Sequence, residues 1–560
     1  MTAFVDAHRE TLDRALAAIA DRGYWSNYPE SPSPRVYGET AAAEGLSAYE
    51  AQLGRRFELN QPGTVGWVGG ERSPYGPELG VTYPQADLDV LLAAAREAMP
   101  AWRDAGPEVR AAVCVEIVDR INKRSFELAN AVMHTSGQAF VMAFQAGGPH
   151  AQDRALEAIA VAYAEQTRVP ATARWEKPQG KRPALIMEKT FTAVPRGIGL
   201  VIGCSTFPTW NSYPGLFASL ATGNAVVVKP HPAAILPLAI TVSIARDVLA
   251  EAGFSPNLVT LVAENPGGTV ASELAVRPEV RIVDFTGSTA FGQWLEEHAR
   301  QAAVYTEKAG VNMVLVDSTD DYAGMLANLA FSLCLYSGQM CTTPQDLLVP
   351  ADGVGTPEGR KSVDEFGADL GAAVEKLLGP DGQAVELLGA IVNDGVLSRV
   401  DGAGSLGTVV IPSRTLTHPA YPQARVRTPA LVRVPADRVE TWGAECFGPV
   451  SFLVVTDTTE EALELMRRTV TVRGALTAAV YSTDEKVIES ARAVAIESGV
   501  ALSENLTETV YVNQSAAFSD FHATGANPAA NSALTDAAYV ASRFRIVQSR
   551  RHLPADPASD

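Results

Sequence analysis

The stretch Ile198-Gly199-Leu200-Val201-Ile202-Gly203 opens the part of the chain that decides the fold. It is a short apolar run, rich in β-branched residues and closed by glycine, as is typical of a strand buried on both faces. Similar runs then alternate with segments of helical periodicity. The predicted strands are 198–203, 225–229, 258–262 and 280–285, and the predicted helices are 213–221, 238–252 and 270–275. This order predicts a parallel α/β sheet that binds ligands at the carboxyl ends of its strands.

A second series of apolar runs follows the first. Its predicted strands are 312–316, 347–349, 430–434, 452–456 and 478–481, with a last strand at 543–547. The sequence therefore predicts two α/β units in succession. Asp352–Asp369 is rich in glycine and charge, which indicates a surface loop or an insertion.

The part of the chain before residue 170 is predominantly helical in pattern. The helical windows are 11–20, 87–101, 108–122 and 151–166. Tyr28–Gly80 is rich in Pro, Gly and Tyr, and we expect it to be irregular. The segments 174–182 and 186–192 predict two strands around a turn, and such an exposed hairpin needs a partner edge.

Composition indicates an ordinary globular protein of several structural units. The 560 residues are 47% hydrophobic and 19% charged, with a net charge of -19. This charge disfavours nucleic acid and anionic membranes as partners. The cysteines are odd in number, scattered and without a Cys-x-x-Cys pair, so we predict no metal site and expect a reducing, cytoplasmic location. They are Cys114, Cys204, Cys334, Cys341 and Cys446.

Cys341 is the candidate nucleophile. It lies in the small and polar stretch Tyr336–Pro344, whereas Cys334 lies within the apolar helical segment Leu326–Leu335, which is typical of core. A thiol attacks as its thiolate, so Cys341 needs a nearby base or cation. A buried structural cysteine is the alternative interpretation for any single Cys.

Other motifs fit a site for a phosphate-bearing cofactor. Phe285-Thr286-Gly287-Ser288-Thr289 takes a strand into a helix, where amide groups and a hydroxyl can hold phosphate, although an ordinary helix N-cap has the same pattern. Lys229 ends an earlier strand, and it is either a contact to the sugar or phosphate of a ligand or an ordinary surface lysine.

Glu307 lies between the two α/β units, where it is either a general base or an ordinary solvated glutamate. The last motif is Glu445-Cys446-Phe447-Gly448-Pro449. Its acid and aromatic ring either contact a ligand or belong to a turn with a packed phenylalanine.

The order of these motifs resembles the aldehyde dehydrogenase superfamily, including the 34-residue interval between Glu307 and Cys341. The resemblance covers roughly Pro195–Asn513. It implies an α/β fold with three parts: a Rossmann-like cofactor domain, an α/β catalytic domain and a small β oligomerisation element. The cofactor domain comprises residues 1–172, which include the N-terminal helical region, and 196–306. The catalytic domain comprises residues 307–512, and the oligomerisation element comprises residues 173–195 and 535–560.

The resemblance also implies a mechanism. Cys341 attacks the aldehyde to give a thiohemiacetal, which loses hydride to a nicotinamide cofactor and leaves a thioester. Glu307 activates Cys341 or the water that hydrolyses the thioester. The residues implied to contact the cofactor are Phe285, Gly287 and Ser288, then Lys229 at the adenosine ribose, and Glu445 with Phe447 at the nicotinamide ribose.

Two positions depart from the family pattern. Thr206 stands where the family has an asparagine that holds the oxyanion, so a single hydroxyl takes that role here. Pro232 stands where many members have a glutamate that binds the ribose hydroxyls. Without a carboxylate to repel a 2′-phosphate, NADP is the expected cofactor, with NAD as the alternative.

The stretches 204–211, 229–232, 341–346 and 518–528 resemble the phenylacetic acid degradation (PaaN) branch of the superfamily. That likeness implies oxidation of a CoA-linked ring-cleavage semialdehyde to its acid by a homodimer or a dimer of dimers. Two alternatives stay open. In one the enzyme is a CoA-acylating dehydrogenase or acyl-thioester reductase, and in the other it is a non-catalytic binding protein.

Overall fold

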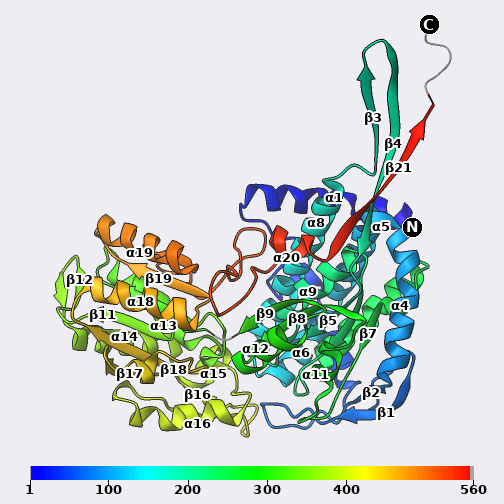
Figure 1. Ribbon diagram of the computed structural model, residues 1–560. Helices are drawn as coiled ribbons and strands as arrows, with labels where there is room; N and C mark the ends of the chain where they lie inside the picture. The colour runs from blue at the N-terminus through cyan, green and yellow to red at the C-terminus, as the bar shows by residue number, and fades with distance from the viewer. Residues whose placement is uncertain (1, 309, 555–560) are drawn as a thin grey trace.

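The computed structural model describes residues 2–308 and 310–554. Figure 1 shows two α/β bodies beside each other, one from the earlier and one from the later part of the chain, with a narrow β arm rising from the first. The strand nearest the C-terminus lies in this arm, beside strands from the first third of the chain. The two α/β units predicted from the sequence are confirmed.

The first sheet has five parallel strands in the order β7-β6-β5-β8-β9. They are β5 (Ile198–Ile202), β6 (Ala225–Lys229), β7 (Val259–Leu261), β8 (Val280–Gly287) and β9 (Ala303–Lys308). The connecting helices are α9 (Pro208–Ala221), α10 (Leu236–Glu251), α11 (Val270–Ala275) and α12 (Thr289–His298). The four predicted strands are confirmed. The prediction lacks β9, because its sequence, Ala-Val-Tyr-Thr-Glu-Lys, has no apolar run.

The second sheet has seven strands in the order β14-β17-β18-β11-β10-β19-β20. They are β10 (Met313–Val316), β11 (Asp346–Pro350), β14 (Thr408–Ile411), β17 (Ala430–Pro435), β18 (Val450–Thr456), β19 (Thr477–Tyr481) and β20 (Ala501–Glu504). All neighbours are parallel except β14, which joins the edge antiparallel to β17. The main helices of this body are α13 (Tyr322–Cys334), α14 (Val363–Leu378), α18 (Thr459–Arg473) and α19 (Glu485–Ser498).

The arm is a three-stranded antiparallel sheet. It consists of β3 (Thr172–Gln179), β4 (Arg182–Pro195) and β21 (Phe544–Leu553) in the order β21-β4-β3. β21 pairs along β4 from Phe544 opposite Pro195 to Leu553 opposite Ile186. The predicted hairpin and last strand are therefore confirmed. Residues 555–560 of the expected oligomerisation element lie outside the described residues.

The N-terminal part wraps the first sheet with helices. They are α1 (Thr2–Asp21), α4 (Leu88–Asp104), α5 (Gly106–Lys123), α6 (Ser125–Ser136) and α8 (Ala151–Thr167). The prediction that Tyr28–Gly80 is irregular is wrong in part, because the Ala-rich run Ala41–Glu50 forms a helix and Thr64–Gly69 forms a strand. Asp352–Asp369 is also not a plain loop. It forms a short hairpin and then starts α14, where Ser362 and Glu365 make a reciprocal capping box.

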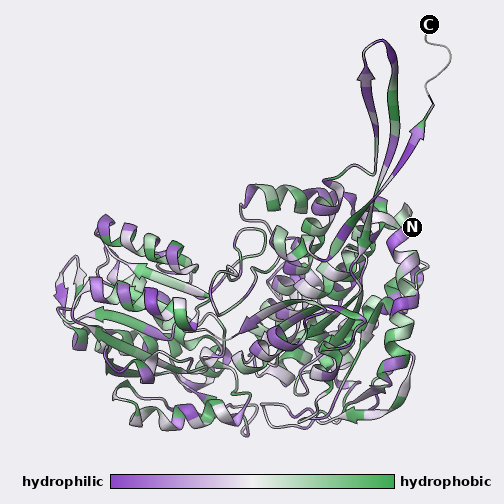
Figure 2. Cartoon of the chain, viewed as in Figure 1, coloured by the Kyte–Doolittle hydropathy of each residue, from purple (hydrophilic) through white to green (hydrophobic). Residues whose placement is uncertain are grey.

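The core of the first body extends into the C-terminal segment. One continuous cluster of buried side chains includes residues from Leu12 to Val540. Arg543 is fully buried and donates hydrogen bonds to Asp284 at 2.6 and 2.8 Å, which fixes the base of the arm to β8. In Figure 2 the strands of both bodies are mostly hydrophobic, and the arm carries many hydrophilic residues. No helix within the described residues has the length and apolarity needed to span a membrane.

Candidate active site

Cys341 lies in the tight turn that joins α13 to β11. Tyr336 and Ser337 in this turn have φ of 53° and 49°, in the left-handed region that side chains rarely adopt. Gly338 is also left-handed, and a Cβ there would lie 2.7 Å from the carbonyl oxygen of Gly448. The turn is therefore strained and pressed against the 445–449 segment, an arrangement found at functional sites.

Asn312 holds the nucleophile turn in place. Its side-chain amide donates to the carbonyl oxygen of Cys341 at 2.7 Å and to that of Thr343 at 3.0 Å. Its side-chain oxygen accepts from the backbone amides of Leu476 and Thr477. One buried side chain thus ties the turn to the start of β19.

Glu307 lies near the end of β9 and is only 4% exposed. The side-chain amide of Asn211, on α9, donates to Glu307 Oε2 at 3.0 Å. The strand is held from outside by the C-terminal segment, since Lys308 donates its backbone amide to the carbonyl oxygen of Ala529 at 2.7 Å. The sequence motifs give no sign of the contact between Asn211 and Glu307.

His522 lies between Glu307 and Cys341. Its Nε2 is 3.0 Å from Glu307 Oε1 and 3.7 Å from Cys341 Sγ. The donor atoms of the three side chains all lie within 4.8 Å of one another. His522 is only 4% exposed, and no sequence motif singled it out.

Burial and charge act on this cluster in opposite directions. Burial raises the pKa of the Cys341 thiol well above its ordinary value, and the negative charge of Glu307 raises it further. Burial also favours the neutral form of Glu307, but His522, together with hydrogen bonds from His522, Cys341 and Asn211, lowers the pKa of its carboxyl below the ordinary value. Glu307 is therefore ionised at neutral pH and faces a thiol that resists ionisation.

Two buried charges anchor the loop that carries His522. Arg154, on α8, donates to Ser515 Oγ at 3.2 Å and to the carbonyl oxygen of Asp520 at 2.9 Å. Its partner Glu157 accepts from the backbone amide of Phe518 at 3.1 Å. The irregular loop is thus attached at several points to a buried helix, which fixes its histidine.

Thr206 lies in the connection between β5 and α9, two residues after Cys204. Its hydroxyl donates to Cys204 Sγ at 3.9 Å, and its carbonyl oxygen accepts from Gln138 at 2.8 Å. The role of Thr206 toward an oxyanion stays a prediction.

Lys229, the last residue of β6, pairs with Glu264. Both side chains are nearly buried, with 4% and 6% exposure, and Glu264 Oε2 also accepts from the backbone amide of Val270 at 3.0 Å. Glu264 lines a cleft of about 630 Å³ at the carboxyl end of β7. A cleft in this position is where a parallel sheet binds ligands, and Glu264 is a residue that sequence motifs did not single out.

The motif at the end of β8 leads directly into α12. Ser288 is the N-cap of α12 and accepts from the amide of Phe291 at 3.4 Å. Phe285 is buried, and a Cβ at Gly287 would lie 2.7 Å from its ring. The helix-cap role of Ser288 is thus present, and contact with a cofactor stays a prediction for all three residues.

Glu445 and Phe447 are half-buried in the segment that faces the nucleophile turn. Gln345 fixes this segment, because its side chain bonds the carbonyl oxygens of Trp442 and Ala444 and the amide of Cys446. Burial raises the pKa of Glu445 to about 7. The structure brings this segment to Cys341, and its contact with a nicotinamide ribose stays a prediction.

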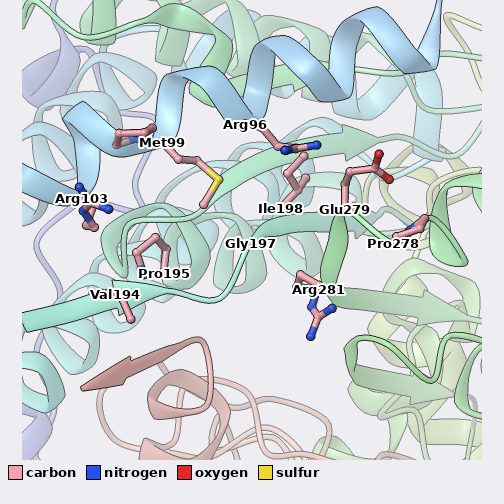
Figure 3. Close-up of a pocket in the computed structure, with 11 residues that line it drawn as sticks. Arg96, Met99, Arg103, Val194, Pro195, Gly197, Ile198, Pro278, Glu279 and Arg281 are labelled. Carbon is pink, nitrogen blue, oxygen red and sulfur yellow. The ribbon is translucent and has the colours of Figure 1, made fainter. Parts of the chain in front are cut away.

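A separate hollow lies at the opposite, amino end of the first sheet. Figure 3 shows Arg96, Met99 and Arg103 on α4 along one side and the segment Val194–Ile198 along the other. Arg281 and Glu279, at the start of β8, complete the lining. Glu307 lies at the opposite edge of the sheet, near the carboxyl end of β9, so this hollow is not part of the Cys341 cluster.

A model of the aldehyde dehydrogenase family matches residues 81–534. Among curated relatives, vanillin dehydrogenase of Pseudomonas fluorescens is 26% identical over 74% of this chain and 80% of its own. The NAD(+) benzaldehyde dehydrogenase of Pseudomonas putida is 24% identical over 68% of this chain and 73% of its own.

Solved structures agree with these matches. An NAD-dependent aldehyde dehydrogenase from Burkholderia multivorans is 58% identical and superposes with a TM-score of 0.97. The match covers 98% of this chain and 99% of the Burkholderia chain. A 1-pyrroline-5-carboxylate dehydrogenase from Thermus with bound NAD is 22% identical, with a TM-score of 0.74 over 95% of this chain and 99% of its own. The second likeness concerns the fold alone.

Proposed function

The chain belongs to the aldehyde dehydrogenase family, and from this premise we propose that it oxidises an aldehyde to the carboxylic acid with a nicotinamide cofactor, through a thioester on Cys341. The observation that carries the proposal is the cluster of Cys341, His522 and Glu307, in which a thiol, an imidazole and an ionised carboxylate meet in one buried place. These are the groups that covalent thiol catalysis requires.

Each residue of the site has a separate role in the proposed reaction. Cys341 Sγ bonds to the aldehyde carbon and forms a thiohemiacetal, whose oxygen receives hydrogen bonds from the Cys341 backbone amide and Thr206. When bound, the nicotinamide supplies the hydride acceptor. Loss of hydride leaves a thioester on Cys341, and Glu307 accepts a proton from the water that hydrolyses it. Asn312 keeps Cys341 in position throughout.

The cleft beside Lys229 suits a dinucleotide. A cationic side chain ends β6, a cleft lies at the end of the neighbouring β7, and α12 begins directly after Ser288, where helix amides can meet a phosphate. We propose Lys229, Phe285, Gly287 and Ser288 as the residues that hold the adenosine and pyrophosphate portions. Glu445 and Phe447 are proposed for the nicotinamide ribose.

The choice between NAD and NADP depends on Glu264. The sequence favours NADP, since Pro232 supplies no carboxylate for the ribose hydroxyls. Glu264 supplies a carboxylate from the neighbouring strand end, and its pairing with Lys229 occupies the cation that could otherwise meet a 2′-phosphate. The similar Burkholderia enzyme is described as NAD-dependent. We therefore propose NAD as the preferred cofactor.

The surroundings of Cys341 favour an apolar aldehyde. A small apolar cluster with Phe207, Leu335 and Tyr336 lies beside the nucleophile turn, and Trp210 and Met340 pack against it. The relatives that act on vanillin and benzaldehyde have aromatic substrates by name. We propose an aromatic aldehyde or a ring-cleavage semialdehyde of phenylacetate catabolism, and the CoA-linked form of the latter is the finer hypothesis from the sequence.

Water is the proposed acceptor of the acyl group. Glu307 is ionised and adjacent to Cys341, as a base for hydrolysis must be. Transfer to CoA, the alternative chemistry, has no comparable residue in its favour.

The test is cofactor reduction, followed as absorbance at 340 nm with purified protein. NAD and NADP are each paired with benzaldehyde, vanillin and a CoA-linked semialdehyde, with and without free CoA. We expect reduction that does not require CoA and that disappears in Cys341→Ser. Reduction that requires free CoA would establish the acylating alternative. Cofactor binding without reduction by any of the aldehydes would contradict the proposal.

A further inference from the structure

The family motifs assign no role to His522, although its ring lies between the proposed nucleophile and Glu307. We propose that His522 is a catalytic residue that takes the thiol proton of Cys341, so that the nucleophile acts as a cysteine–histidine pair supported by Glu307. This inference rests on the proposed function, because it assumes that Cys341 forms the acyl-enzyme.

Glu307 by itself is a weak base for the thiol, although the Cys341 thiol hydrogen-bonds it. Its Oε2 accepts from the Asn211 amide, and its Oε1 lies 3.0 Å from His522 Nε2. Donors to a carboxylate stabilise its charged form and make it a weaker base. Its negative charge also opposes a second negative charge on Cys341 Sγ. A thiolate here needs a cation, and imidazolium provides one.

The proton step conserves charge within the cluster. The step starts from the neutral tautomer that carries its proton on Nδ1, so that Nε2 can accept. The Sγ–H bond of Cys341 breaks, its electron pair stays on sulfur, the proton bonds to His522 Nε2, and the new N–H donates to Glu307 Oε1. The products are a thiolate and an imidazolium beside the Glu307 carboxylate. The cluster carries a single net negative charge before and after transfer, so the two charges that the step creates are paired with each other in the buried site.

The ring has a suitable partner at each nitrogen. Nε2 faces both Cys341 Sγ and Glu307 Oε1, and this differs from a linear triad, in which the carboxylate bonds the far nitrogen. Nδ1 lies 3.4 Å from Ser515 Oγ, which can accept the second N–H of the imidazolium. Such catalytic contacts are often long before substrate binds.

Neighbouring groups fix the ring without competing for its proton. Trp210 meets the imidazole edge to face, with centroids 4.7 Å apart. Arg154 reaches the ring only through Ser515 and Trp210, and its charge is paired with Glu157 at 2.8 Å. The titratable groups that directly face His522 are therefore Cys341 and Glu307.

The test is the rate at which iodoacetamide alkylates Cys341 in the full-length protein, measured from pH 5 to 10 by peptide mass mapping. We compare wild type with His522→Gln, which keeps a polar side chain but cannot bind the proton. His298→Gln is the matched control, since His298 is an exposed histidine on α12.

Burial and the charge of Glu307 raise the pKa of the Cys341 thiol, and we expect the His522 imidazolium to offset both, so that wild-type Cys341 reacts below pH 7. His522→Gln should react at least about tenfold more slowly at pH 7, because one unit in thiol pKa changes the thiolate fraction tenfold. His298→Gln should behave as wild type. An unchanged rate and pH profile in His522→Gln would overturn the inference.

A second measurement covers the case in which His522→Gln does not fold. The thiolate absorbance at 240 nm is recorded for wild type minus Cys341→Ala across pH. A thiolate that forms below about pH 7 supports the pair, and one that forms only above the ordinary thiol range of about 8.5 overturns it.

These readouts need neither aldehyde nor cofactor. If alkylation depends on His522 but no aldehyde reduces the cofactor, the proposed function fails and the proton acceptor stands. If the cofactor is reduced but alkylation ignores His522, the function stands and the inference fails.

Discussion

At the scale of single residues, Glu264 is the side chain on which cofactor choice depends. It pairs with Lys229 and borders the cleft at the end of β7. Replacing Glu264 with Gln removes the carboxylate and leaves the Lys229 cation free to meet a 2′-phosphate. We expect kcat/KM for NADP relative to NAD to rise about tenfold, equivalent to about 1.4 kcal/mol. The measurement is initial rate against each cofactor.

Glu273→Gln is the control for this substitution. Glu273 is an exposed carboxylate that lines the same cleft. It suits as a control because Lys229 forms its ion pair with Glu264. The control should keep the wild-type ratio. A ratio that changes equally in both variants would show that the general charge of the cleft, and not Glu264, selects the cofactor.

Asn312 offers a second test, because its effect on the turn can be separated from its effect on stability. Asn312→Ala removes four hydrogen bonds, which should lower the free energy of unfolding by about 2 to 4 kcal/mol. We also expect kcat to fall about a hundredfold, the cost of a misplacement near 1 Å. Thermal melts and steady-state kinetics measure the two effects.

Asn224→Ala is the matched comparison. Asn224 is also buried and bonds several backbone groups, among them the amides of Arg196 and Gly197, at the amino end of the first sheet. It should lose stability and keep kcat. If Asn312→Ala keeps kcat as well, the turn does not depend on Asn312 for its position.

The sequence predicted part of the site and missed part of it for a physical reason. Cys341 and Glu307 stand in local motifs with a fixed interval, and the structure brings them together. His522 is separated from Cys341 by 181 positions and Asn211 from Glu307 by 96, so only the folded chain creates these contacts. Glu264 was missed likewise, because it reaches Lys229 from another strand.

At the scale of elements, β11 begins with a buried acid. Asp346 is fully buried, and within the described residues its carboxylate oxygens have no hydrogen-bond partner. Burial raises the pKa of Asp346 well above its ordinary value of 3.8. The folded protein therefore keeps this acid protonated to a higher pH than the unfolded chain does.

This difference predicts a stability that depends on pH. The contribution of Asp346 is fully present below pH 3.8 and is lost as pH rises toward the folded-state pKa, at about 1.4 kcal/mol per pH unit. Asp346→Asn cannot ionise. Its melting temperature should exceed that of wild type by an amount that grows as pH rises above 3.8 toward the folded-state pKa. A difference that stays constant as pH rises above 3.8 would mean that the folded state does not favour the protonated acid.

Elements were predicted well where a strand is apolar and buried on both faces, as in β5, β6 and β19. They were predicted poorly where burial follows from tertiary contacts. β9 reads as polar because it ends in Glu307 and Lys308, whose burial depends on the C-terminal segment packed over them. The local sequence of a strand does not show that a distant segment will pack over it.

At the scale of the whole molecule, the arm of β3, β4 and β21 stands away from both bodies. Along β21, residues 545–552 are all exposed, so neither face of this thin sheet has a cover within the described residues. Three strands without a packed face are marginally stable alone. We propose that a second copy of the chain covers the arm, in a homodimer or a dimer of dimers, as the sequence resemblance implies.

The arm prediction can be tested with two apolar side chains on β21. Ile546 and Val547 are 37% and 55% exposed. Changing both to Asp should leave the fold intact and shift the protein from dimer to monomer in sedimentation velocity, because buried like charges oppose association. Ile496→Asp is the control, since Ile496 is 83% exposed on α19, outside the arm. It should sediment as wild type.

If wild type is monomeric at micromolar concentration, or if the double variant stays dimeric, the arm is not the contact between copies. Retention of Cys341 alkylation in the double variant would show that each chain contains a complete nucleophile site.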